Sequence, residues 1–139
     1  MVGSSANGGH ASGGYFRAFR VKRQAMKKNR GNYVVLVTCG TRAEARKVAR
    51  LVVAAKLAAC VNVLTAPVES TYRWKGKVES AREFLLVMKT THARFPALRE
   101  AVLKAHSYDV PEIITLPIAA GSDKYLAWIA DSTTSPLKA

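Results

Sequence analysis

The sequence predicts a single α+β domain in which strands and helices alternate in the order β-α-β-β-α-β-α. Short apolar runs rich in β-branched residues alternate with segments whose apolar residues recur at helical spacing. The length of 139 residues is typical of one domain, and an apolar fraction of 49% is enough to build a core. No apolar run approaches the roughly 18 residues that a membrane span needs, so no association with a membrane is expected.

The first predicted unit is a strand followed by a capped helix. Residues 33–37 are consecutively apolar and mostly β-branched, which predicts a buried strand. Thr41 and Glu44 have the spacing of a capping box, in which the carboxylate returns to the amide of the capping residue. Apolar residues continue at helical spacing to Leu57, so a helix is expected over 42–57.

A hairpin is expected next. Residues 60–74 alternate loosely between polar and apolar, and Pro67 should interrupt this strand because proline cannot donate to a neighbouring strand. Lys75 and Gly76 predict a two-residue turn, since glycine readily takes a positive φ. The return strand is expected over 77–90.

The remaining elements are a second helix, a short strand and a last helix. Pro96 must lie in the first turn of the second helix or kink it. Prolines bracket the strand that is predicted over 111–118. The last helix is amphipathic, and its Tyr125 and Trp128 are expected to lie in the core.

This order of elements is that of the ferredoxin-like β-α-β-β-α-β plait with an extra C-terminal helix, in which the two main helices cover one face of an antiparallel sheet. The first and third strands, however, are apolar on consecutive residues, a pattern typical of strands buried on both sides. Two or three helices cannot cover both faces of such a sheet. The sequence therefore predicts an oligomer in which another subunit covers the second face.

The net charge of +13 is unevenly distributed. Residues 1–32 hold seven Lys and Arg and no acidic residue, whereas residues 33–139 hold fifteen basic and nine acidic residues. Because the first fourteen residues are rich in Gly, Ser and Ala, residues 1–32 are predicted to be a flexible basic extension; a nucleic-acid-binding arm is the alternative. The extension has no apolar segment of the secretory kind, and Cys39 and Cys60 cannot form a disulfide framework, so a cytoplasmic location is expected.

Several segments resemble, in order and spacing, the motifs of the CutA family of divalent-cation tolerance proteins: VVLVTC, KLAACVNV, STYRWKGKVE, LLVMKT, HSYDVPEIITLPI and YLAWI. The resemblance covers roughly residues 33–131 and indicates a CutA-like domain over 33–139. It implies a cytoplasmic homotrimer with a ferredoxin-like fold, a role in the response to metal ions, and binding of copper or another divalent cation. It implies neither catalysis nor a required cofactor.

Three residues are candidate metal ligands: His106, Cys39 and Glu112. His106 ends the second predicted helix, and its imidazole suits copper, zinc or nickel; a helix cap or a contact between subunits is the alternative. Cys39 precedes a capped helix, a position that lowers the pKa of a thiol, although a lone cysteine is more often a small buried hydrophobe. Glu112 would complete a mixed oxygen and nitrogen site with His106. Cys60 is expected to lie in the core.

A second candidate site is polar and aromatic: Tyr72, Trp74, Tyr108, Glu112 and Lys89 resemble the residues of the cleft between subunits in the CutA family. Such a cleft is suited to a small anion or a metabolite. The alternative is that these residues form an interface between subunits, with Trp74 as an anchor at the tip of the hairpin.

The motifs of common enzyme classes are missing from the sequence. It contains no GxSxG and no glycine-rich phosphate loop, so the protein is expected not to be an enzyme. One alternative function is a small-molecule sensor similar to the PII signalling proteins, using the clefts between subunits. Another is nucleic-acid binding, but residues 83–89 lack the aromatic spacing of an RNA-recognition sheet. Binding of that kind is therefore expected to be weak, salt-dependent and confined to the basic extension.

Overall fold

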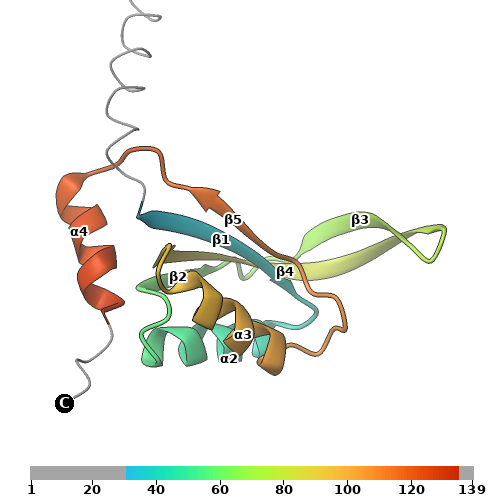
Figure 1. Ribbon diagram of the computed structural model, residues 1–139. Coiled ribbons are helices and arrows are strands. Elements are labelled where there is room, and N and C mark those ends of the chain that lie inside the picture. Colours follow the sequence, from blue (N-terminus) through green and yellow to red (C-terminus); the bar gives the residue numbers. More distant parts are fainter. Residues whose placement is uncertain (1–30, 135–139) are drawn as a thin grey trace, which may run out of the picture.

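The structure is a computed structural model that describes residues 31–134 (Figure 1). This part of the chain has a mixed α+β fold with a five-stranded antiparallel sheet and three helices. The order is the predicted one except that the segment expected as a single strand over 60–74 forms two strands. Apart from its last two residues, the basic extension predicted over 1–32 lies outside the described residues. The elements are β1 (Asn32–Cys39), α2 (Arg42–Ala54), β2 (Cys60–Val63), β3 (Val68–Trp74), β4 (Lys77–Thr91), α3 (Phe95–Ala105), β5 (Ile113–Pro117) and α4 (Asp123–Ser132).

Strands β1 and β4 form the centre of the sheet. They pair antiparallel along the whole of β1, from Asn32 opposite Thr91 to Cys39 opposite Phe84. β5 lies on the other side of β1 and β2 on the other side of β4, so the strand order is β2-β4-β1-β5. This pairing brings the C-terminal end of β1 beside the middle of β4, where the candidate site lies.

Strand β4 is long enough to serve two sets of partners. Its second half pairs with β1 and β2, and its first half pairs with β3 in a hairpin that projects beyond the sheet (Figure 1). Residues 64–67 separate β2 from β3, as Pro67 predicts. The predicted turn is confirmed, because Lys75 has φ 48° and Gly76 has φ 77°, the two positive values that a tight type I′ turn requires.

The main core lies between one face of the sheet and the helices α2 and α3 (Figure 1). Its fully buried apolar residues include Val35, Val37, Val48, Val52, Leu86, Met88, Leu98 and Val102. Side chains alternate along a strand, so Leu36 and its partner Ile114 face the opposite side of the sheet. There Ile114 is 48% exposed and Leu116, on the same face of β5, is 51% exposed. This side of the sheet therefore carries apolar surface that a single chain leaves open to solvent.

Helix α4 differs from the prediction. It packs against β1 and β4, and Ile129 is its single buried residue. Tyr125 and Trp128 were expected to lie in the core, but they are 43% and 44% exposed, so that prediction is wrong. The reason is geometric: a ten-residue helix that meets the sheet along one line buries one edge and leaves its other faces open.

The boundaries of other elements shift by a few residues. Helix α2 ends at Ala54 rather than residue 57, because Lys56 takes a φ of 57° and turns Leu57 back into the core. Pro96 does lie in the first turn of α3. Cys60, expected in the core, is only partly buried at the start of β2. No helix between residues 31 and 134 is long and apolar enough to cross a membrane.

Candidate functional site

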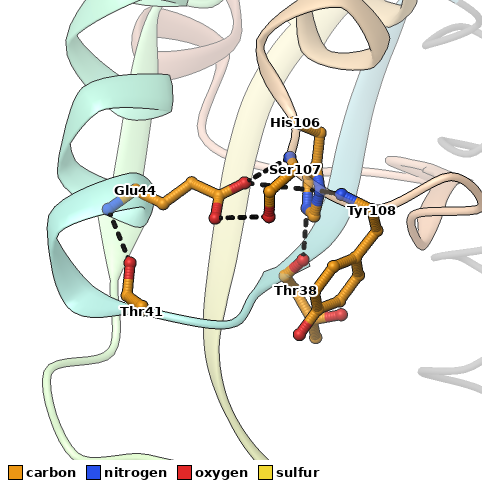
Figure 2. Close-up of polar contacts among 6 residues, drawn as sticks. All are labelled: Thr38, Thr41, Glu44, His106, Ser107 and Tyr108. Carbon is orange, nitrogen blue, oxygen red and sulfur yellow. Dashed lines mark hydrogen bonds and ion pairs between the residues drawn. The ribbon is translucent and has the colours of Figure 1, made fainter.

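His106 stands at the end of α3, where the chain leaves the helix. Its own amide still donates to Val102, but its backbone is extended and its ring points inward. Nε2 lies 2.7 Å from the carbonyl oxygen of Thr38, and the amide of Tyr108 donates to Nδ1 at 3.1 Å (Figure 2). A carbonyl oxygen only accepts, so Nε2 carries the proton and Nδ1 is the acceptor. Both ring nitrogens of His106 are thus engaged within the chain.

Glu44 joins the start of α2 to the end of α3. Its amide donates to Thr41 Oγ1 at 3.1 Å, which is the first half of the predicted capping box. The carboxylate, however, accepts from the amide and the hydroxyl of Ser107, at 2.8 and 2.9 Å (Figure 2). The expected return of the carboxylate to the capping residue is therefore wrong. Glu44 Oε1 also lies 3.4 Å from Nδ1 of His106, which in the neutral tautomer is a contact and not an ion pair.

Cys39 is the last residue of β1 and is fully buried. Burial, with smaller contributions from the charges of Glu44 and Glu83, raises the pKa of its thiol from 9.0 to about 12. The sequence left two interpretations of Cys39: a thiol whose pKa is lowered by the helix N-terminus, and a small buried hydrophobe. The structure agrees with the second and contradicts the first, because loss of solvent and two nearby carboxylates outweigh the helix dipole.

Among the described residues, Cys39, Glu44 and His106 form the one group of three or more side chains whose potential metal-binding atoms lie within 4.8 Å of one another. Two of the three candidate ligands predicted from the sequence are thus brought together. The third, Glu112, lies elsewhere, and Glu44 occupies its place. The sequence predicts Glu44 only as part of a helix cap, because the spacing of residues does not show that α3 ends beside it.

The second predicted site forms a cavity of about 730 Å³ between the β3–β4 hairpin and residues 108–112, called here the hairpin cavity. It is lined by Thr38, Ser70, Thr71, Tyr72, Arg73, Trp74, Glu79, Glu83, Tyr108, Asp109, Val110, Pro111 and Glu112. Four of the five residues predicted for a cleft therefore share one cavity. Lys89 does not reach it, because it lies six residues beyond Glu83, about 20 Å along an extended strand. Its ammonium donates to the side chain of Asn62 on β2 instead.

Three acidic residues of the hairpin cavity were missed by the sequence analysis: Glu79, Glu83 and Asp109. Glu79 and Glu83 are four residues apart on β4 and so share one face of the strand, a signal that the sequence does contain. Glu83 is buried, with 8% exposure. Burial first, and then the charge of Glu83, raises the pKa of Glu112 and raises the pKa of the Tyr108 hydroxyl to about 12. The electrostatic potential in the cavity is therefore negative.

Gly40 allows Tyr108 to reach this position. A Cβ atom on Gly40 would lie 2.8 Å from the hydroxyl oxygen of Tyr108, closer than a Cβ atom approaches other atoms. On its other side, the Tyr108 ring lies against His106, with the ring centroids 4.8 Å apart. Tyr108 thus forms the wall between the Cys39–Glu44–His106 cluster and the hairpin cavity.

Comparison with known proteins gives a consistent result. A sequence model of the family described as CutA1 divalent ion tolerance protein matches residues 33–132. The chain is 46% identical to the divalent-cation tolerance protein CutA of Thermus thermophilus over 100 residues, covering 72% of this chain and 96% of the relative. It is 45% identical to the chloroplastic protein CutA of Arabidopsis thaliana over 113 residues, covering 81% of this chain but 62% of that longer relative.

Solved structures agree with the sequence matches. The Thermus thermophilus structure has a TM-score of 0.72 at 45% identity and covers 74% of this chain and 99% of that one. The CutA1 structure from Oryza sativa has a TM-score of 0.73 at 42% identity, with coverages of 76% and 96%. The chain therefore belongs to the CutA1 family of divalent ion tolerance proteins.

Proposed function

We propose that this protein is a non-enzymatic, homotrimeric divalent-cation tolerance protein that binds a divalent cation, with Cu(II) the first to test. The observation that carries the proposal is the approach of Cys39, Glu44 and His106 within 4.8 Å. A thiol, an imidazole and a carboxylate form a donor set suited to copper or zinc rather than to calcium or magnesium. The name of the Thermus relative, a divalent-cation tolerance protein, supports the same function.

Binding at this cluster requires local rearrangement. Nδ1 of His106 accepts from the amide of Tyr108, and the carboxylate of Glu44 accepts twice from Ser107. A metal ligand must be deprotonated, so Cys39 has to release its proton on binding. We therefore expect metal binding to weaken as the pH falls and to perturb the environment of Tyr108.

Calorimetric titration of Cu(II) into the His10→Ala protein with a blocked N-terminal amine tests the proposal. His10 and the free amine are removed because imidazole and amine nitrogens are copper ligands in their own right. We expect micromolar or tighter binding that is lost in His106→Ala and in Cys39→Ser. The matched control is His92→Ala, which removes an exposed histidine bonded to Tyr33. Equal copper affinity in all these proteins would reject the cluster as the metal site.

The strand order and the uncovered apolar surface support a homotrimer. The order β2-β4-β1-β5, with α2 and α3 against one face, is the order of a ferredoxin-like plait with β3 added in the hairpin. The other face has Ile114 and Leu116 about half exposed, and Trp74 at the tip of the hairpin is 41% exposed. Exposed apolar and aromatic residues of this kind are typical of subunit interfaces.

Light scattering tests the oligomeric state. We expect the wild type to have three times the chain mass of 15.1 kDa, and Trp74→Ala to dissociate or to weaken the assembly. Circular dichroism would show that the variant still folds. A Trp74→Ala protein that remains a trimer with wild-type thermal stability would contradict the role given to Trp74.

A second candidate function is small-molecule sensing of the PII kind. The hairpin cavity favours it, because a volume of about 730 Å³ is in the range of ligand pockets. Nucleic-acid binding stays a prediction about residues 1–32, most of which lie outside the described part of the chain. A cytoplasmic location also stays a prediction, since the names of the Arabidopsis and rice relatives place those proteins in chloroplasts.

A further inference from the structure

We propose that the hairpin cavity binds an organic cation that carries N–H donors, such as a primary amine or a guanidinium group. This proposal rests on the second candidate function, small-molecule sensing, and names the chemical class of the ligand. None of Cys39, Glu44 and His106 lines this cavity.

The cavity is acidic in a strongly basic chain. Four of the nine acidic residues line it: Glu79, Glu83, Asp109 and Glu112. Its single basic residue is Arg73, whose guanidinium group donates to the carbonyl of Gly76 in the hairpin turn. Residues 33–139 hold fifteen basic and nine acidic residues, a net charge of +6, so a random sample of this surface would be basic. The local excess of carboxylates therefore selects cations over anions.

Glu83 has no cationic partner to balance its burial. It is 8% exposed and lines the cavity, and between residues 31 and 134 no Lys, Arg or His forms an ion pair with it. The charge of this carboxylate contributes to the raised pKa of Tyr108, which lines the same cavity. Removing a carboxylate from water without an opposite charge is costly, and a bound cation would supply that charge. A buried carboxylate that faces an open cavity thus indicates the position of a ligand's positive group.

The walls of the cavity add a second kind of attraction. Tyr72 and Trp74 line the cavity from β3, and Tyr108 lines it from the segment after α3. Aromatic faces attract ammonium and guanidinium groups through their quadrupoles. Carboxylates around the same space accept N–H bonds, so the combination favours a ligand with both a positive charge and hydrogen-bond donors.

The spacing of the acidic groups disfavours a bare metal ion. Divalent calcium and magnesium need six or more oxygen ligands at about 2.0–2.6 Å. In the described part of the chain, the one group of close potential ligands is Cys39–Glu44–His106, which does not line the cavity. The carboxylates of the cavity belong instead to β4 and to residues 109–112, around a space of about 730 Å³. A space of that size fits an organic molecule.

Calorimetric titration of the full chain with spermidine tests the proposal, and the fluorescence of the two tryptophans gives a second readout. We expect saturable binding that is at least tenfold weaker in Glu83→Gln and weaker in Glu112→Gln. Glu83→Gln keeps the size of the side chain and one acceptor oxygen, so the charge is the main change. Glu69→Gln is the matched control, because Glu69 is exposed on β3 and does not line the cavity. We expect choline, which carries charge without N–H donors, to bind more weakly than spermidine.

The outcomes separate the two levels of the proposal. Equal spermidine affinity in wild type, Glu83→Gln and Glu112→Gln would overturn it, and equal affinity for choline would overturn the role given to the carboxylate hydrogen bonds. Parallel titrations use ATP and citrate. If either anion binds in the cavity and spermidine does not, the ligand class is wrong while small-molecule sensing stands. If none of these ligands binds, both fail. Should Glu83→Gln fail to fold, the exposed Glu112→Gln still decides the result.

Discussion

The Cys39–Glu44–His106 cluster and the hairpin cavity lie on either side of Tyr108 but differ in how their polar groups are satisfied. In the cluster, His106 and Glu44 have hydrogen-bond partners within the chain, and the Cys39 thiol is protonated. In the cavity, the carboxylates outnumber the basic groups, and Glu83 has no ion-pair partner among the described residues. The hydrogen bonds of the cluster stabilise the fold and must break before a ligand can bind there. The carboxylates of the cavity lack opposite charges, so a ligand can bind them without breaking contacts of this kind.

One short segment serves both regions. His106 belongs to the cluster, Ser107 donates to Glu44 of the cluster, and residues 108–112 line the cavity. The two hydrogen bonds that Ser107 donates to Glu44 hold the start of this segment against α2, while Gly40 leaves space for Tyr108. The cluster therefore positions one wall of the cavity. This relation predicts that changes in the cluster reduce stability first and alter the cavity as a consequence.

The largest expected effect concerns the thiol of Cys39. A pKa raised from 9.0 to about 12 lowers its thiolate fraction at neutral pH by about a thousandfold relative to an ordinary thiol, and burial slows its reaction further. Alkylation of the native protein with iodoacetamide, followed by mass spectrometry, should modify Cys60 and leave Cys39 intact. Cys60, partly exposed, is the internal control. Similar rates at the two cysteines would mean that the cluster is open in solution.

The next effect is on stability. His106→Ala removes the partner of the Thr38 carbonyl and of the Tyr108 amide and leaves a buried gap. We expect a loss of about 2–4 kcal/mol in the free energy of unfolding, measured in urea at one protein concentration. His92→Ala, on the surface, should cost about 0.5 kcal/mol or less. If the two variants lost similar free energies of unfolding, the buried hydrogen bonds of His106 would stabilise the fold no more than an ordinary surface contact does.

Gly40→Ala tests the link between the two regions. The added Cβ would meet the Tyr108 hydroxyl at 2.8 Å, so the ring must move toward the cavity. We expect a loss of about 1–2 kcal/mol in stability, a changed near-ultraviolet circular dichroism spectrum and weaker spermidine binding. Gly31→Ala is the matched control, because a Cβ there meets nothing within 4 Å. Wild-type spectra and affinity in Gly40→Ala would show that Tyr108 is not held by this contact.

The smallest expected effect is the pH dependence contributed by Glu112. Burial and the charge of Glu83 raise its pKa above 4.5 in the folded state, so the folded protein holds this proton more tightly than the unfolded chain does. The contribution of Glu112 to stability is therefore favourable at low pH and is lost as the pH rises from 4.5 through the raised value. Glu112→Gln should reduce the fall in unfolding free energy between pH 4.5 and 7, measured by urea titration, and Glu69→Gln should not. If Glu112→Gln left the pH dependence of the unfolding free energy unchanged, this would contradict a negative electrostatic potential in the cavity.

Local sequence signals predicted most of the fold. The apolar run at 33–37, the spacing behind Thr41, and the Lys75–Gly76 turn each depend on neighbours within a few residues, and the structure agrees with them. The errors occur where a distant segment decides the outcome. Tyr125 and Trp128 have the spacing of a buried face, but α4 meets the sheet along one line and buries only Ile129.

The sequence by itself determined the order of the strands and helices, the family, and four of the residues that line the hairpin cavity, because periodicity, turn chemistry and family motifs are local properties. Only the tertiary structure decided which chemical groups meet. It brought Glu44 rather than Glu112 to Cys39 and His106, kept Lys89 out of the cavity, and added Glu79, Glu83 and Asp109 to it. It also raised the pKa of Cys39 where the local signal predicted a decrease. The physical reason is that burial and the fields of distant charges depend on how β1, β4 and the end of α3 come together.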